Sequence, residues 1–153
     1  MVAERVVARR RFLKAAGSTT AAVLALAGTV DAEWTSVEKA NVQVVNEFCA
    51  SFAGRDMAKI ASFLADTCVY RVTETAIPLV GKDAVVARIK GFVDPAQVVE
   101  FPVAETFAKG PIVMNERTDR FVRPDRTNTF HVVGVFFVRD GKIAEWTDYI
   151  IRG

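Results

Sequence analysis

The sequence MNERTDRFVRPDRTNTFHVVGVFFVRDGKIAEWTDY, residues 114–149, decides the fold class. Two turn sequences divide it into three strand-like runs: Pro124-Asp125-Arg126 and Arg139-Asp140-Gly141. Asp-Gly between apolar runs is a strong signal for a tight hairpin, because both residues tolerate the backbone conformation that such a turn needs. The stretch therefore predicts consecutive antiparallel strands over residues 112–123, 127–138 and 142–151.

The same runs carry a possible catalytic group of residues. Successive side chains of a strand point to opposite faces, so Arg117, Asp119 and Phe121 share one face, and Trp146 and Asp148 share a face of the last run. If both acids face inward, two carboxylates and a guanidinium meet in an apolar cavity. Two carboxylates in such a cavity do not easily both ionise, so one pKa rises and the two become an acid/base pair. The alternative is a surface Arg117–Asp119 ion pair and a solvated Asp148.

The rest of the chain predicts helices first and strands last. A helix is expected from Ser36, as its cap, to about Ala53, followed by a short helix capped by Asp56. A strand over residues 67–75, a helix over 82–92 and a strand over 97–108 follow. Segregated elements of this kind indicate an α+β domain. The length of 153 residues fits one domain, and eleven Phe among 51% hydrophobic residues indicate an aromatic interior.

Residues 1–32 read as a twin-arginine export signal rather than as part of the domain. Arg9-Arg10-Arg11-Phe12-Leu13-Lys14 fits the pattern R-R-x-F-L-K, and Val30-Asp31-Ala32 offers a small-residue cleavage site. The apolar run between them has about 15 residues, short of the roughly 20 that a spanning helix needs. The division expected is thus a signal over residues 1–32, recognised by the twin-arginine translocon, and a domain over residues 33–153 outside the cytoplasm.

The composition excludes several function classes. Without residues 1–32 the chain carries 15 basic and 16 acidic residues, so no basic surface suggests nucleic-acid binding. One His and two scattered Cys make a classical metal site improbable, and no metal or organic cofactor is expected. Cys49 and Cys68 are better explained as small buried thiols than as a disulfide.

The element order resembles the nuclear transport factor 2-like fold, and the C-terminal half resembles the limonene-1,2-epoxide hydrolase family. The pattern G-V-F-x-x-x-x-G-K-I-x-x-W-x-D-Y occurs from Gly134 to Tyr149, and Glu116-Arg117-Thr118-Asp119 resembles the family's E-R-x-D. The resemblance covers residues 37–149. It implies a cone-shaped, curved mixed sheet packed on three N-terminal helices, with a deep pocket, and a homodimer formed through the outer face of the sheet.

The resemblance also implies an activity, the opening of an epoxide by water to a vicinal diol. Asp148 would be the base, Asp119 the acid and Arg117 the bridge between them. Tyr70 would position the water, although it sits one residue late, and Val72 occupies the spacing of the family's asparagine. The pocket wall expected for an apolar terpene, sterol or lipid epoxide consists of Phe121, Phe130, Val132, Trp146, Val85 and Ile89.

Two other functions fit the same residues. A SnoaL-like cyclase or a ketosteroid-isomerase-like protein needs one acid for proton transfer, which explains Asp148 but not the paired Arg117 and Asp119. A binding module for an apolar ligand needs no acid pair, and the absent asparagine and the export signal favour it. His131 is expected to face away from the pocket, because Phe130 and Val132 face into it.

The export segment generates a first prediction. N-terminal sequencing of the protein from the cell envelope should begin at Glu33, because Ala32 ends the small-residue site. Replacing Arg9 and Arg10 by Lys should retain the protein in the cytoplasm, whereas Arg5→Lys, outside the pattern, should not. Full-length protein found only in the cytoplasm of cells that carry the unchanged sequence would contradict this prediction.

Overall fold

The computed structural model describes residues 33–151, so the predicted export segment lies outside the described residues. The helices are α2 (Ser36–Ser51), the 3-10 turn η1 (Phe52–Gly54), α3 (Met57–Ser62) and α4 (Lys82–Val93). The strands are β1 (Leu64–Arg71), β2 (Leu79–Val80), β3 (Val98–Glu100), β4 (Val103–Lys109), β5 (Ile112–Val122), β6 (Thr127–Arg139) and β7 (Lys142–Ile150). None of the helices within residues 33–151 is long and apolar enough to cross a bilayer.

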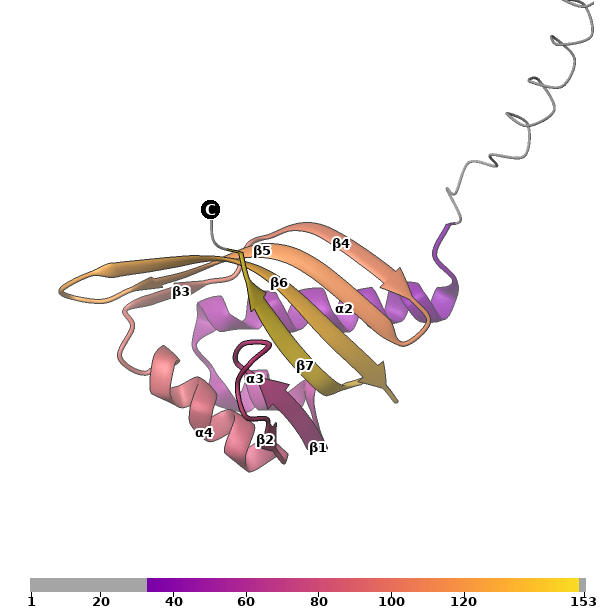
Figure 1. Cartoon of the computed structure of the whole chain (residues 1–153), viewed down its shortest axis with the longest axis horizontal. Coiled ribbons are helices and arrows are strands. Elements are labelled where there is room, and N and C mark those ends of the chain that lie inside the picture. Colours follow the sequence, from indigo (N-terminus) through magenta and orange to yellow (C-terminus); the bar gives the residue numbers. More distant parts are fainter. Residues whose placement is uncertain (1–32, 152–153) are drawn as a thin grey trace, which may run out of the picture. The chain divides into compact units, whose positions relative to one another are not determined.

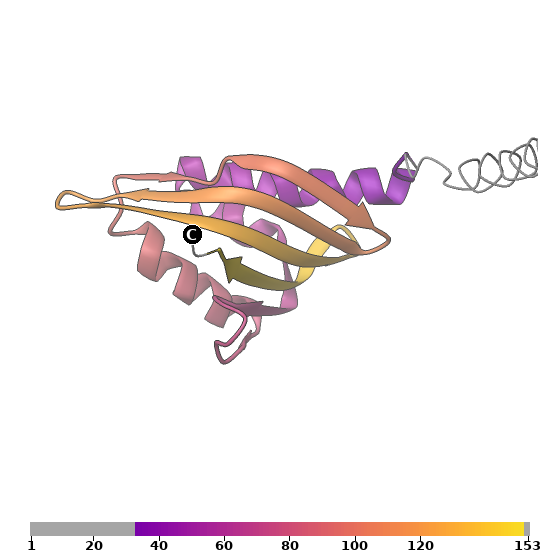
Figure 2. The ribbon, with the colours of Figure 1, turned by 45° about the horizontal axis from the view of Figure 1, so that its top comes forward.

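All seven strands form one mixed sheet that curves over the helices (Figure 1). The order is β2-β1-β7-β6-β5-β3, and β4 pairs with the other half of the β5 edge that β3 occupies. β1 runs parallel to β7, and every other pair is antiparallel. Figure 2 shows the curvature of the long strands β5 and β6. The predicted α+β class with a curved mixed sheet on helices is confirmed.

Local sequence signals explain the element ends. Thr35, rather than the expected Ser36, caps α2: its hydroxyl accepts from the Glu38 amide, and the Glu38 carboxylate accepts from the Thr35 amide at 2.8 Å. Asp56 caps α3 as expected, accepting from the amides of the next turn. Asp140 and Gly141 have φ values of 49° and 70°, which makes the predicted Asp-Gly turn between β6 and β7.

Two strand predictions were displaced. β1 starts at Leu64 rather than residue 67, because Leu64 is buried and pairs with Ile143 of β7 directly after α3. The single strand expected over residues 97–108 breaks at Phe101-Pro102 into β3 and β4. Pro102 has no amide hydrogen to donate to a ladder, and Phe101 turns inward to stack on Phe52 with ring centroids 4.2 Å apart.

Aromatic packing joins the helices to the inner face of the sheet. Phe48 of α2 contacts the rings of Phe52, Phe63, Phe136 and Trp146 at centroid distances of 5.2 to 6.2 Å. This confirms the predicted aromatic interior. Cys49 and Cys68 are buried and free, as expected. Trp146 of this cluster also lines a cavity that extends to the β5–β6 hairpin.

The outer face of the sheet presents a row of exposed apolar side chains. Phe107 of β4 pairs with Met114 of β5, and their exposed fractions are 55% and 37%. Tyr149 of β7, 43% exposed, lies farther along the same face. The homodimer through this face, which the resemblance implies, stays a prediction.

Candidate active site

Arg117 of β5 binds both predicted acids. Its Nε donates to Asp119 Oδ1 at 2.7 Å and its Nη2 donates to Asp119 Oδ2 at 3.1 Å. The same Nη2 donates to Asp148 Oδ1 of β7 at 2.7 Å. The three residues are buried, with exposed fractions of 1%, 7% and 5%. The inward alternation predicted for both strands is therefore confirmed, and the surface ion pair is excluded.

Asp148 has donors that Asp119 lacks. Trp146 Nε1 donates to Asp148 Oδ1 at 2.7 Å, and the Tyr70 hydroxyl donates to Asp148 Oδ2 at 3.3 Å. Tyr70 reaches this acid because β1 lies beside β7 and pairs it with Trp146, on which its ring stacks at 3.9 Å. Both donors stabilise the ionised form of Asp148, whereas Asp119 has Arg117 alone.

The surroundings hold the guanidinium charged and fixed. Its carbon lies over the rings of Phe101, Phe136 and Trp146, 5.4 to 5.9 Å from their centroids. Burial alone would lower the pKa of Arg117, but Asp148 and Asp119 raise it overall. Its Nη1 donates to Asn115 Oδ1 at 3.1 Å, and Asn115 Nδ2 lies 3.4 Å from Cys49 Sγ.

Asn115 and Gly134 complete the site and were not predicted as parts of it. Asn115 precedes Arg117 on the inward face of β5, so strand alternation could have found it. Gly134 pairs with both Asn115 and Asp148. A Cβ at this position would collide with Arg117 Nη1 and lie 2.7 Å from Phe136 and 2.9 Å from Asn115 Oδ1. Glycine here leaves the space that the guanidinium occupies.

The two acids differ in how their pKa values are set. Burial raises the pKa of Asp119 to about 6; Arg117 opposes that rise, and the charge of Asp148 adds to it. Burial also raises the pKa of Asp148, against Arg117, Trp146 and Tyr70, which all lower it. With both acids ionised the buried group has one excess negative charge. One proton on either acid neutralises the group of Arg117, Asp119 and Asp148, so the two acids titrate as a coupled unit.

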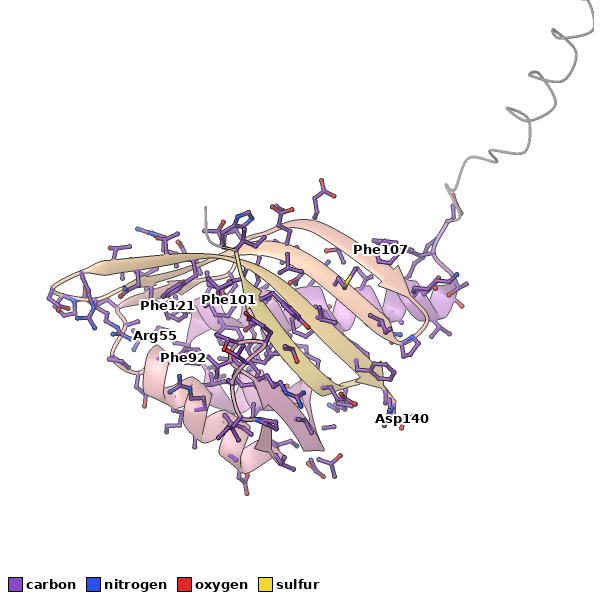
Figure 3. The ribbon with its side chains drawn as sticks, in the orientation of Figure 1. Arg55, Phe92, Phe101, Phe107, Phe121 and Asp140 are labelled. Carbon is purple, nitrogen blue, oxygen red and sulfur yellow. The ribbon has the colours of Figure 1, made fainter. Side chains whose placement is uncertain are left out.

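A cavity of about 280 Å³ opens beside the acids. Asp119, Asp148 and Tyr70 line it, and so do the predicted wall residues Phe121, Phe130, Val132 and Trp146. Val85 and Ile89 do not: both are fully buried in the core, and α4 presents Arg88 and Phe92 to the cavity instead. The prediction chose the apolar face of α4, which packs into the core, whereas the cavity borders the adjacent face. Figure 3 shows Phe92, Phe101 and Phe121 together between α4 and the sheet.

Other candidate groups lie away from the acids. His131 is on the outer face, where its Nε2 lies 2.7 Å from Glu116 Oε1 in an exposed pair, as alternation predicted. Among residues 33–151, no three His, Cys, Asp or Glu side chains converge to hold a metal ion. Asp119, Asp148 and Tyr70 thus present the polar groups of this site to the cavity, and Arg117 lies behind the two acids.

The family follows from a comparison over most of this domain. The model of the SnoaL-like domain matches residues 45–146, more than half of the chain, from α2 to β7. The chain belongs to the SnoaL-like domain family. The match includes Arg117, Asp119 and Trp146 and ends two residues before Asp148.

Solved structures share the fold of this SnoaL-like domain at low identity. An LEH-like epoxide hydrolase from M. tuberculosis matches with 24% identity and a TM-score of 0.68, over 74% of this chain and 84% of that chain. A candidate SnoaL-like polyketide cyclase from Jannaschia sp. CCS1 matches with 13% identity and a TM-score of 0.68, over 77% and 90%. A candidate polyketide cyclase from Xanthomonas campestris matches with 18% identity and a TM-score of 0.65, over 74% and 92%. These similarities show the fold, and the chemistry has to be argued from the site.

The close contact at Gly134 gives a prediction about packing. Gly134→Ala should lower the free energy of unfolding by about 1–3 kcal/mol, because the hydrogen bonds that hold Arg117 prevent it from moving aside. Gly91→Ala is the control: this glycine lies in α4, has no atom within 4 Å of an added Cβ and no positive φ. It should stabilise the domain by about 0.5–1 kcal/mol. Urea unfolding measures both, and equal effects would contradict the packing argument.

The raised pKa of Asp119 gives a prediction about pH. A carboxyl that binds its proton more tightly when folded stabilises the fold at low pH and loses that contribution as pH rises through the folded pKa. A rise from 3.8 to about 6 corresponds to roughly 3 kcal/mol. The unfolding free energy of Asp119→Asn, minus that of the wild type, should therefore increase by about 2–3 kcal/mol between about pH 4 and about pH 7.

The control for this experiment is Asp140→Asn, which removes an exposed carboxylate in the β6–β7 turn and keeps a residue that tolerates positive φ. Its difference from the wild type should not show the rise. A flat difference for Asp119→Asn would show that Asp119 is already ionised in the folded protein near pH 4.

Proposed function

We propose that this SnoaL-like domain opens an epoxide with water to give a vicinal diol, without a metal, organic cofactor or covalent intermediate. The observation that carries the proposal is the contact of one buried guanidinium with two carboxylates at the inner end of a largely apolar cavity. A cyclase or an isomerase that moves one proton needs a single acid. Arg117 between two acids suits a reaction in which one proton is taken and another is given in the same step.

The division of roles follows from the donors around each acid. Asp148 is the base, since Trp146 and Tyr70 join Arg117 in stabilising its ionised form. Asp119 is the acid, since burial raises its pKa to about 6 and its hydrogen bonds come from Arg117 alone. The LEH-like epoxide hydrolase of M. tuberculosis, which shares the fold, adds to the case for this reaction class.

The step balances its protons. Asp148 takes a proton from a water molecule, whose oxygen attacks one epoxide carbon. The bond between that carbon and the epoxide oxygen breaks, and Asp119 gives its proton to the leaving oxygen. Asp148 is then protonated and Asp119 ionised, and transfer of one proton between them restores the site. Asp148 gains a proton as Asp119 loses one, and Arg117 contacts both acids, so the total charge beside Arg117 does not change during the step.

Tyr70 is the proposed partner for the water. Its hydroxyl reaches Asp148 Oδ2, the oxygen that Arg117 and Trp146 leave free. Val72 also lines the cavity, at the spacing where the epoxide hydrolase family has asparagine. The water therefore has one polar partner fewer at the end of β1, and poor orientation of a reactant is costly.

Val72 is also the observation that favours a second function, a binding module or a cyclase for a largely apolar ligand. The cavity volume of about 280 Å³ suits a terpene or a fatty-acid chain better than a sterol, since drug-sized ligand pockets span about 300–1,000 Å³. This alternative uses the same cavity and the same class of ligand, but it needs no attacking water.

Turnover of an epoxide panel tests the proposal. Asp148→Asn and Asp119→Asn should each lower kcat/KM by at least about 10²–10⁴-fold, and the double variant by little more, because the acids act as one unit. Asp140→Asn should retain full activity, as its side chain is exposed at the β6–β7 turn. Tight binding of apolar ligands with no turnover of any epoxide would replace the hydrolase by the binding module.

Isotope labelling distinguishes direct attack by water from a covalent ester. In a single turnover in ¹⁸O-labelled water, the label should appear in the diol and in no carboxylate of the protein. Label in an Asp side chain, or loss of activity on treatment with EDTA, would rule out this mechanism.

A further inference from the structure

Three arginines line the cavity. Arg88 comes from α4, whereas Arg123 and Arg126 come from the two sides of the β5–β6 hairpin. None of them belongs to the apolar wall that the sequence predicted. Arg123 and Arg126 lie on the hairpin side of Phe121 and Phe130, so the polarity of the cavity changes along β5 and β6.

Backbone register shows why Arg123 faces the cavity. Asp119 and Phe121 of β5 and Arg123, directly after its end, line the cavity at alternate positions, and Asp119 pairs with Phe130 of β6. The Arg123 amide donates to the Arg126 carbonyl at 2.8 Å, so these two residues close the hairpin as neighbours. Arg123 is four residues from Asp119, which corresponds to about 13 Å along a strand.

The positive charge at this end is little compensated. Within residues 33–151 neither Arg88 nor Arg123 forms a salt bridge, and Arg126 has one with Asp125 at 3.3 Å, with both side chains more than half exposed. Residues 33–153 have a net charge of −1, so general basicity does not explain three arginines around one opening.

Arg123 has a second unusual feature. Its Nε is buried and has no hydrogen-bond partner, and no other buried side-chain nitrogen or oxygen among the described residues lacks one. Buried polar groups are nearly always paired in folded proteins. Arg120, on the outer face of the same strand, instead pairs with Glu100 at 2.7 Å. A solvated surface explains Arg120, but it does not explain a half-buried guanidinium that lines a cavity with an unpaired donor.

The geometry points to a substrate with two ends, an epoxide whose apolar body carries a carboxylate about 13 Å away. The carboxylate lies between Arg123 and Arg126, whose planar forks match its two oxygens, and Arg88 adds charge from α4. The apolar body contacts Phe92, Phe121 and Phe130. The epoxide lies at Asp119 and Asp148. The arginines alone support a bound carboxylate, whereas the presence of an epoxide rests on the proposed function.

Calorimetry with unreactive ligands tests the carboxylate end by itself. The full-length protein should bind decanoate at least about tenfold more tightly than decanol, a ligand of the same chain length without charge. Arg123→Gln and Arg126→Gln should each lower the affinity for decanoate about tenfold and leave that for decanol unchanged.

Arg120→Gln is the matched control, since it removes the same charge from the opposite face of β5. It should leave both affinities unchanged. Equal affinity of the wild type for decanoate and decanol would overturn the inference, and this comparison needs no variant to fold. An equal loss in Arg120→Gln and Arg123→Gln would overturn it too, because it would indicate nonspecific attraction.

Kinetics separate this inference from the proposed reaction. A long-chain epoxy acid should have a KM at least about tenfold lower than its methyl ester, with a similar kcat. Hydrolysis of both with equal KM would overturn the carboxylate site and retain the hydrolase. Preferential binding of decanoate without turnover of either epoxide would retain the carboxylate site and overturn the hydrolase.

Discussion

The buried charge of Arg117 is the constraint on which the site depends. A guanidinium with 1% of its residue exposed has to be compensated, and Asp119 and Asp148 do so from two different strands. Removing one partner of such a buried group typically costs about 3–5 kcal/mol. The register of β5, β6 and β7 is therefore tied to the ion pairs, since a one-residue slip would turn an acid to the outer face. Gly134, on the strand between them, leaves the room that this arrangement needs.

Strand alternation made much of this site predictable, because it depends on no distant contact. It placed Arg117, Asp119, Trp146 and Asp148 on inner faces and His131 on the outer one. The break at Phe101-Pro102 was missed because it depends on stacking against η1. The prediction that Val85 and Ile89 of α4 line the cavity was wrong, because helical periodicity identifies the face that packs into the core. The cavity borders a different face of α4.

The arginines were missed for a related reason. Arg126 belongs to the turn sequence Pro124-Asp125-Arg126, and turn residues usually face solvent. Arg123 ends the predicted strand over residues 112–123, where alternation puts it on the face of Asp119 and Phe121, but the predicted wall included only apolar residues. Only the pairing of β5 with β6 and the position of α4 bring them to one opening with Arg88. The predicted wall around the acids was apolar throughout, whereas the structure adds three arginines to the lining of the cavity.

The asymmetry between the two acids is a consequence of sheet topology. Both are buried to a similar degree, and one guanidinium binds both. The difference comes from β1, which runs parallel to β7 and brings the Tyr70 hydroxyl to Asp148, while the indole of Trp146 reaches the same acid from two residues away. Asp119 lies on β5, which β7 and β6 separate from β1, and it has no hydrogen bond from either donor. The two aspartates are chemically identical, and they differ because only Asp148 has neighbours that donate hydrogen bonds to it besides Arg117. Many chemistries share this fold, so such local differences decide what a site can do. When the pair holds one proton, that proton should reside on Asp119, which has fewer hydrogen-bond donors than Asp148. Both acids line the same cavity.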